Sequence, residues 1–117
     1  MKKILVIDDD EDILESVSLI LEKAGFDVDT HNTGLDVLAK VLEYKPHAIL
    51  LDVKLPGKSG TEVYKELCKT GTTPVIFFSA NADKQKVLKE CDAYAFIAKP
   101  FDMKNLVQVI SGCVNRA

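Results

Sequence analysis

The chain has 117 residues, of which 47% are hydrophobic and 28% charged, and its formal net charge is −3. This length suffices for one domain with its own core, and the slightly acidic balance argues against a broad surface for nucleic acid or anionic membranes. No apolar run approaches the roughly 20 residues that a membrane-spanning helix needs, so we expect a cytoplasmic protein.

In the first half of the chain, apolar strands alternate with amphipathic helices. A strand is expected at about 3–7, a helix that ends near Gly25, an alternating edge strand at 26–30, a second helix, and an unbroken apolar strand at 48–51. The helices are predicted from apolar residues at helical spacing, which are Ile13, Val17, Ile20, Leu21 and Ala24 in the first, and Leu35, Leu38, Ala39 and Leu42 in the second.

The same alternation continues to the end of the chain. A third helix offers Val63 and Leu67, a turn spans 71–74, and a strand at 75–78 precedes a short helix around 83–90. A last strand at 94–98 and a final helix complete the pattern, the helix through Met103, Leu106, Val107, Ile110 and Val114. We therefore predict a single domain over residues 1–117.

Five strand–helix units indicate a three-layer α/β fold with a doubly wound parallel sheet, (βα)5 and flavodoxin-like. The alternating second strand belongs at an edge, and the unbroken first and third strands belong in the centre. These placements favour the strand order 2-1-3-4-5. Cys68, Cys91 and Cys113 lie at apolar helix positions without metal-ligand spacing, so we expect them to be small buried hydrophobic residues.

Polar residues stand where four of the apolar strands end. Asp8 and Asp9 follow the first strand, Asp52 the third, Ser79 the fourth and Lys99 the fifth. Because ligands of open parallel sheets bind outside the carboxyl ends of the strands, we expect these side chains to converge. Each residue alone has a commoner explanation, such as a helix cap for an aspartate or a serine; the conjunction of all five favours a site.

The three carboxylates repel one another and need a cation between them. Oxygen ligands suit Mg²⁺ or Mn²⁺ rather than zinc. A carboxylate beside such an ion and a lysine can act as a nucleophile toward phosphorus. Asp52, alone at the end of the central strand, is the best candidate.

Four motifs resemble those of the response-regulator receiver domain of two-component signalling, and the match covers essentially the whole chain. They are Ile4-Leu5-Val6-Ile7-Asp8-Asp9-Asp10, Leu50-Leu51-Asp52-Val53-Lys54-Leu55-Pro56-Gly57, Phe77-Phe78-Ser79-Ala80 and Ala98-Lys99-Pro100-Phe101. Each motif is weak alone, but the four in order are specific. The segment from Ser79 to Lys99 is shorter than in chemotaxis-type receivers, so we expect a short fourth helix.

The resemblance implies roles for individual residues. Asp52 would accept a phosphoryl group, and Lys99 would pair with it. Asp8, Asp9, Asp52 and the backbone carbonyl of Lys54 would hold Mg²⁺. Ser79 and Phe96 would be the switch pair, and Pro100 would follow a cis peptide bond.

The resemblance also implies partners and a mode of action. The phosphoryl donor would be a sensor histidine kinase or a histidine phosphotransfer protein, and phosphorylation would change the affinity for a downstream protein. The domain would catalyse only its own phosphorylation and dephosphorylation. Since no output module follows and Met1 directly precedes the first strand, we expect a stand-alone receiver that binds neither DNA nor membranes.

Alternatives stay open at this stage. One is a haloacid-dehalogenase-like phosphatase, which also uses a strand-end aspartate; Asp8 and Asp10 have the required spacing, but Glu11 stands where a small residue is expected. Another is a receiver domain that is part of a larger regulator or hybrid kinase. A flavodoxin-like cofactor carrier is disfavoured, because the acidic residues after the first strand would repel a flavin phosphate.

Overall fold

A five-stranded parallel sheet forms the centre of the molecule, in the order β2-β1-β3-β4-β5. The computed structural model describes residues 1–115. The elements are β1 (Lys3–Ile7), α1 (Glu11–Lys23), β2 (Asp27–His31), α2 (Val37–Tyr44), β3 (Ala48–Leu51), α3 (Gly60–Cys68), β4 (Val75–Ala80), the 3-10 turn η1 (Asn81–Asp83), α4 (Lys84–Glu90), β5 (Ala95–Lys99) and α5 (Met103–Asn115). The predicted fold class and strand order are confirmed.

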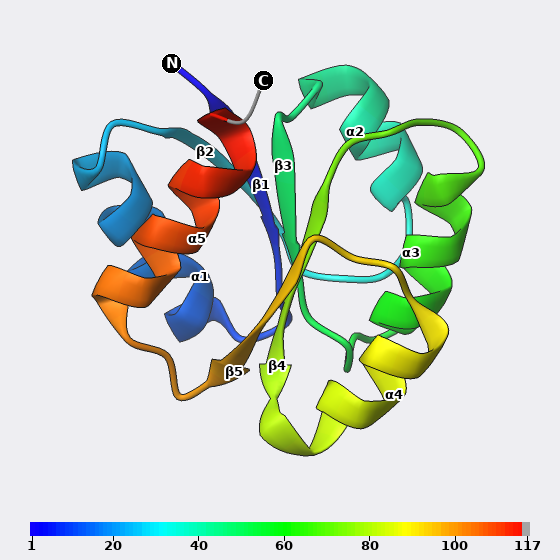
Figure 1. The fold of residues 1–117 in the computed structure, drawn as a ribbon. Helices are drawn as coiled ribbons and strands as arrows, with labels where there is room; N and C mark the ends of the chain where they lie inside the picture. Colours follow the sequence, from blue (N-terminus) through cyan, green and yellow to red (C-terminus); the bar gives the residue numbers. More distant parts are fainter. Residues whose placement is uncertain (116–117) are drawn as a thin grey trace.

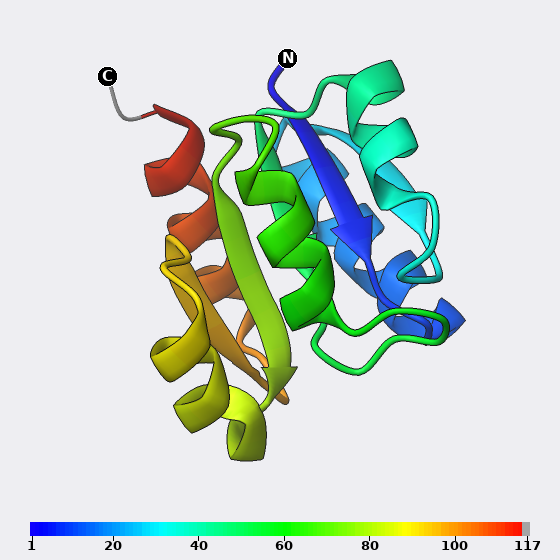
Figure 2. The same cartoon turned by 90° about the vertical axis from the view of Figure 1, so that its right-hand side faces the viewer.

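Helices cover both faces of the sheet. Figures 1 and 2 show α1 and α5 on one face and α2, α3 and α4 on the other. All five strands run in the same direction, so their carboxyl ends share one edge, at the bottom of Figure 1. The predicted short fourth helix is also confirmed, since α4 has seven residues.

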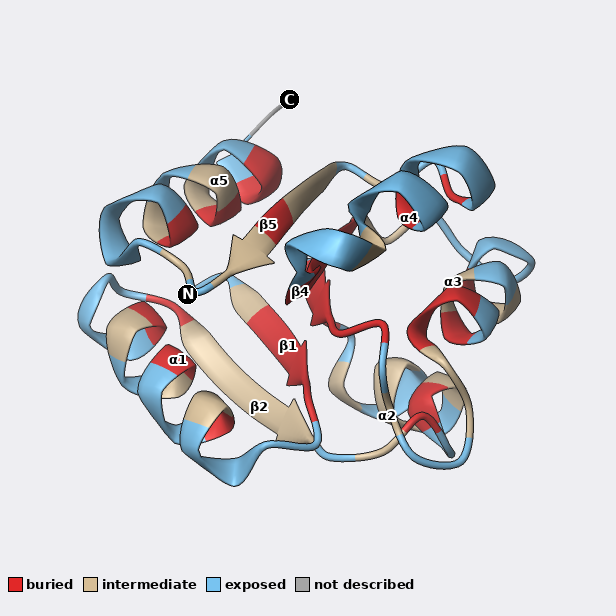
Figure 3. Cartoon of the chain, turned by 90° about the horizontal axis from the view of Figure 1, so that it is seen from below, coloured by how far each residue is buried: buried red, intermediate tan, exposed pale blue. Residues whose placement is uncertain are grey.

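The strands divide their side chains between two separate cores. Alternate strand residues point to opposite faces, so Val6, Leu50 and Phe78 join the core under α1 and α5. Ile7, Leu51 and Phe77 join the core under α2, α3 and α4. Figure 3, a view onto the carboxyl edge, shows buried residues in the central strands and along the inner sides of the helices.

Several details of the helices differ from the prediction. Leu35 precedes α2, because Asp36 adopts a left-handed conformation (φ 60°) at the N-cap, and both Leu35 and Leu42 are exposed. Val37, Leu38 and Val41 pack against the core instead. In α1 the buried residues are Leu14, Val17 and Leu21, and in α5 Met103 is exposed while Cys113 is buried.

The expectation that all three cysteines are buried is wrong for one of them. Cys91 and Cys113 are buried, but Cys68 is exposed. Cys68 is the last residue of α3 and follows the buried Leu67 on the helix. It therefore lies on the solvent side of the apolar stripe.

Gly60 lies where the start of α3 comes close to the backbone that follows β3. A Cβ at this first position of α3 would overlap the backbone carbonyl oxygen of Asp52, whereas a Cβ at Gly112 in α5 would make only an ordinary contact. Alanine is the better helix former at both sites. We expect Gly60→Ala to lower the free energy of unfolding by about 1–3 kcal/mol, the usual cost of overpacking, and Gly112→Ala to raise it by about 0.5–1 kcal/mol. Urea unfolding measures both; equal stabilisation by the two variants would contradict the close approach.

Candidate functional site

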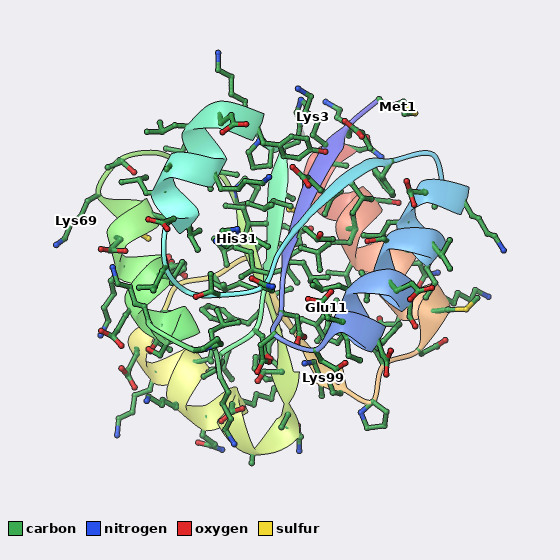
Figure 4. All side chains as sticks on the ribbon, turned by 180° about the vertical axis from the view of Figure 1, so that it is seen from behind. Met1, Lys3, Glu11, His31, Lys69 and Lys99 are labelled. Carbon is green, nitrogen blue, oxygen red and sulfur yellow. The ribbon has the colours of Figure 1, made fainter. Side chains whose placement is uncertain are left out.

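The polar residues that follow or end the strands meet at the carboxyl edge of the sheet. Asp8 directly follows β1, Asp52 directly follows β3, Ser79 lies near the end of β4, and Lys99 ends β5. Figure 3 looks onto this edge, and Figure 4 shows Lys99 there. Asp8, Asp52 and Ser79 are buried, with 1%, 6% and 2% of their surface exposed. Burial of three polar side chains at a sheet edge indicates a built site rather than a solvated surface.

Lys99 joins the two buried carboxylates. Its Nζ donates to Asp8 Oδ2 at 2.6 Å and to Asp52 Oδ2 at 3.2 Å. The ammonium also lies 4.9 Å from the centre of the Phe78 ring, a favourable cation–π distance. The lysine is thus held by two charges and one aromatic face.

Asp8 uses both of its oxygens. Oδ1 accepts the Asp10 backbone N–H at 3.0 Å, while Oδ2 accepts Lys99. Burial raises the pKa of Asp8 above its ordinary 3.8, although the hydrogen bond from Lys99 opposes this effect. Burial alone would lower the pKa of Lys99, but its bond with Asp8 and the charge of Asp52 outweigh burial and raise it above 10.5. Both directions keep Lys99 charged and mark Asp8 as a carboxylate that is costly to ionise.

Asp9 completes an acidic cluster that can hold a metal ion. One carboxylate oxygen from each of Asp8, Asp9 and Asp52 lies within 4.8 Å of the others, and Asp9 is exposed. Three carboxylates and one ammonium leave two negative charges (−3 + 1 = −2). Hard oxygen donors with this residual charge fit a divalent cation such as Mg²⁺.

Asp10 has a role that the sequence analysis did not assign. Its carboxylate accepts the backbone N–H groups of Asp12 and Ile13, so it is the N-cap of α1. The alternative reading of Asp8 or Asp9 as the helix cap is therefore wrong. Asp10 thus caps the helix, while a carboxylate oxygen of Asp9 lies within 4.8 Å of oxygens of Asp8 and Asp52.

The loop between β3 and α3 borders the cluster and is held from both sides. Ser59 and Glu62 form a reciprocal capping box at the start of α3. On the other side, the Pro56 carbonyl accepts from the Gly34 N–H and from the Thr33 hydroxyl, both at 3.0 Å. A groove of about 560 Å³ runs beside this loop, with Asp9, Lys54, Pro56, Asp83 and Lys86 among its lining residues.

Ser79 points to a partner that the sequence analysis missed. Its hydroxyl donates to Asp83 Oδ2 at 2.8 Å, and it does not cap the following helix, whose N-cap position is Asp83. The spacing of four residues does not by itself indicate this contact, because Ser79 lies on β4 and the chain turns through η1 before it reaches Asp83. Phe96 is partly buried and packs against the core under α2, α3 and α4. The Lys99–Pro100 peptide bond is cis, as expected.

Known proteins resemble this chain along its length. The family model described as "Response regulator receiver domain" matches residues 4–111. Over 120 aligned residues, the chain is 39% identical to a "Transcriptional regulatory protein CpxR homolog" from Haemophilus influenzae, covering 100% of this chain and 52% of that protein. It is 33% identical to a "DNA-binding response regulator MtrA" from Mycobacterium tuberculosis, covering 98% of this chain and 51% of that protein. The chain thus spans about half the length of these curated relatives.

Solved structures agree with the sequence matches. A response regulator receiver domain protein from Clostridium thermocellum superposes with a TM-score of 0.89 at 30% identity, covering 99% of this chain and 96% of the other. The chemotaxis response regulator CheY4 of Vibrio cholerae gives 0.88 at 28% identity, covering 97% and 98%.

The raised pKa of Asp8 generates a prediction about stability. The folded state holds the Asp8 proton more tightly than the unfolded chain does, so this residue's contribution to stability falls as the pH rises above 3.8. Without divalent cations at neutral pH, we expect Asp8→Asn to raise the free energy of unfolding by about 0.5–2 kcal/mol. The gain should shrink as the pH falls toward 3.8, because folded wild type takes up the Asp8 proton at a higher pH than the unfolded chain does.

Asp12→Asn is the matched control. Asp12 is exposed in the first turn of α1, where a negative charge is favourable, so its loss should lower stability by a few tenths of a kcal/mol. Urea unfolding at several pH values measures both variants. A loss of stability in Asp8→Asn at neutral pH would show that ionised Asp8 is not a cost to the fold.

Proposed function

The chain belongs to the response regulator receiver domain family, and from this membership we propose that Asp52 is its phosphoacceptor. Phosphoryl acceptance is the general role of receiver domains in two-component systems. The observation that carries the proposal is the bridge of Lys99 between Asp8 and Asp52, because it fixes a positive charge beside one carboxylate at the end of the central strand. We also propose that residues 1–117 form one receiver unit.

In the proposed reaction, an Asp52 carboxylate oxygen attacks the phosphorus of a phosphohistidine. A P–O bond forms, the P–N bond breaks, and the electron pair and a proton remain with the imidazole. The phosphoryl group carries roughly −1.5 to −2 charge. The Lys99 ammonium lies 3.2 Å from Asp52 Oδ2 and stabilises that negative charge electrostatically. Phosphoryl transfer depends mainly on such positioning and neutralisation. Receiver domains are not enzymes in the ordinary sense, and we propose that this one acts catalytically only on its own phosphorylation state.

We propose that Asp8, Asp9, Asp52 and the Lys54 backbone carbonyl hold Mg²⁺, or Mn²⁺ in its place. The support is the convergence of three carboxylates within 4.8 Å and their residual negative charge. A bound divalent cation supplies positive charge that offsets the carboxylates and the phosphoryl oxygens. Asp9, the exposed member of the cluster, is the residue most open to such an ion.

The proposed partners are a histidine kinase or histidine phosphotransfer protein as donor, and a downstream protein whose affinity changes with phosphorylation. Ser79 and Phe96 are the proposed switch pair. The expectation of a stand-alone receiver without DNA binding has no support, because the relatives named as transcriptional or DNA-binding regulators are about twice as long as the aligned region. Within residues 1–115, no helix is both long and apolar enough to cross a bilayer.

The phosphatase alternative is not favoured by the geometry. An Asp-x-Asp phosphatase would need Asp10 as a free acid beside Asp8, but the Asp10 carboxylate accepts two backbone N–H groups at the start of α1. Asp8 likewise has both oxygens in use. Among the residues that the structure describes, the Asp52 carboxylate accepts a side-chain hydrogen bond from Lys99 alone.

Mass spectrometry of the intact protein tests the acceptor. With Mg²⁺ and acetyl phosphate or phosphoramidate, we expect wild type to gain a labile adduct of about 80 Da, the mass of one phosphoryl group. Asp52→Asn should gain none, because an amide is not a nucleophile toward phosphorus. Chelation of divalent cations should abolish the adduct in wild type. An adduct that persists in Asp52→Asn would move the acceptor to another residue, with Asp8 and Asp9 tested next.

Two neighbouring aspartates test the metal site. We expect Asp9→Asn to weaken Mg²⁺ binding by about 10- to 100-fold, the range found when a supporting group at a metal site is lost. Asp10→Asn removes the same charge one residue away and keeps an N-capping side chain, so its Mg²⁺ affinity should change by less than about threefold, as for a screened nearby charge. Isothermal titration calorimetry measures both affinities. Equal losses in the two variants would mean that general acidity, rather than Asp9 itself, attracts the ion.

A further inference from the structure

We propose that Asp83 is a positioning residue that competes with the phosphorylated Asp52 for the hydroxyl proton of Ser79. This inference rests on the proposed function and deepens it, because it names the group that holds the switch serine in the unphosphorylated protein. The bond between Ser79 and Asp83 is the feature that carries it.

Ser79 can serve only one strong acceptor at a time. Its side chain is 2% exposed, and a serine hydroxyl has a single proton to donate. That proton goes to Asp83 Oδ2 at 2.8 Å, a hydrogen bond to a carboxylate, which is stronger than one between neutral groups. A phosphoryl oxygen that recruits the Ser79 hydroxyl must therefore first break the bond to Asp83.

The Asp83 side chain does not cap α4, although Asp83 occupies the N-cap position of that helix. It is the N-cap residue of α4, yet its side chain makes no capping hydrogen bond with the described residues, and its backbone is already helical (φ −86°, ψ −10°). Aspartates at an N-cap position normally accept hydrogen bonds from the first backbone N–H groups of the helix. Since this carboxylate accepts from Ser79 instead, its loss should not cost α4 a cap.

The bond also ties β4 to α4. Ser79 lies on β4, whereas Asp83 lies at the junction of η1 and α4. α4 is otherwise weakly anchored, because Val87 is its single buried residue. When the Ser79 hydroxyl turns to the phosphoryl group, α4 loses this polar tie to the sheet. The position of α4 thereby becomes sensitive to the state of Asp52.

Asp83 has a second effect that must be separated from the first. It lines the same groove as Asp9 and Lys54, so its negative charge also repels an incoming phosphoryl group. Repulsion does not depend on the Ser79 hydroxyl, whereas competition for the proton does. A double-mutant cycle with Ser79→Ala distinguishes the two effects.

The experiment measures the affinity for beryllofluoride, a tetrahedral phosphoryl mimic, in the presence of Mg²⁺ by titration of backbone amide NMR signals. The proteins are wild type, Asp83→Ala, Ser79→Ala and the double variant. We expect Asp83→Ala to bind the mimic about 3- to 10-fold more tightly than wild type, as follows from one hydrogen bond of ordinary net strength. In the Ser79→Ala background, removal of Asp83 should leave the affinity unchanged within about twofold.

Two further variants serve as controls. Asp83→Asn keeps an acceptor but loses the charge, so it should give a smaller gain than Asp83→Ala, and it replaces Asp83→Ala in the cycle if that variant does not fold. Glu90→Ala removes a carboxylate from the other end of α4, where its partner is the exposed Lys65; it should leave the affinity unchanged.

The outcomes separate this inference from the proposed function. If wild type binds the mimic and gains the phosphoryl adduct, but Asp83→Ala changes nothing or weakens binding, the competition is refuted while the phosphoacceptor stands. An equal gain with and without the Ser79 hydroxyl also refutes it, in favour of simple repulsion. If wild type neither binds the mimic nor forms the phosphoryl adduct, the proposed function is refuted, and the proposed competition is refuted with it.

Discussion

The mutual repulsion of carboxylates at one sheet edge is the constraint on which the site depends. Two such charges about 4 Å apart repel by roughly 4 kcal/mol at an effective dielectric of 20. Lys99 relieves this repulsion by bonding Asp8 and Asp52 together. In the sheet order, its strand β5 is separated from β3 by β4, so the long lysine side chain must reach across the end of β4.

The same bridge explains why strand order and chemistry cannot be separated. Asp8 and Lys99 are 91 residues apart in sequence, and the parallel sheet brings the carboxyl ends of β1 and β5 to one edge, where the lysine side chain spans the two intervening strands β3 and β4. Helix α1 then begins where its cap, Asp10, leaves Asp9 at the cluster. Local capping and long-range topology thus act on the same few residues.

Much of this arrangement could be predicted from the sequence. Buried parallel strands read as unbroken apolar runs, so β1, β3 and β4 were clear, and the polar residues at their ends marked the site. The buried faces of the helices were less predictable. Because Asp36 adopts a left-handed conformation at the N-cap, α2 begins at Val37, after Leu35, which the apolar spacing had placed in the helix. The choice of Asp10 as the N-cap of α1, among three consecutive aspartates, depends on backbone geometry that composition does not contain. The bond from Ser79 to Asp83 was missed for the same reason, since either residue alone fits a cap.

The two separate cores have a consequence for insertions and deletions. In β5, Ile97 belongs to the core under α1 and α5, whereas Phe96 packs against the core on the other face. Strand alternation gives Lys99 the orientation of Ile97, in keeping with its position over the ring of Phe78. The ammonium therefore approaches the carboxylates from one face, while Phe96 stands on the face that carries α4. One residue inserted between Phe96 and Lys99 would reverse that parity and turn the lysine toward the wrong helices. The spacing between these two side chains is consequently as much a part of the site as their identities.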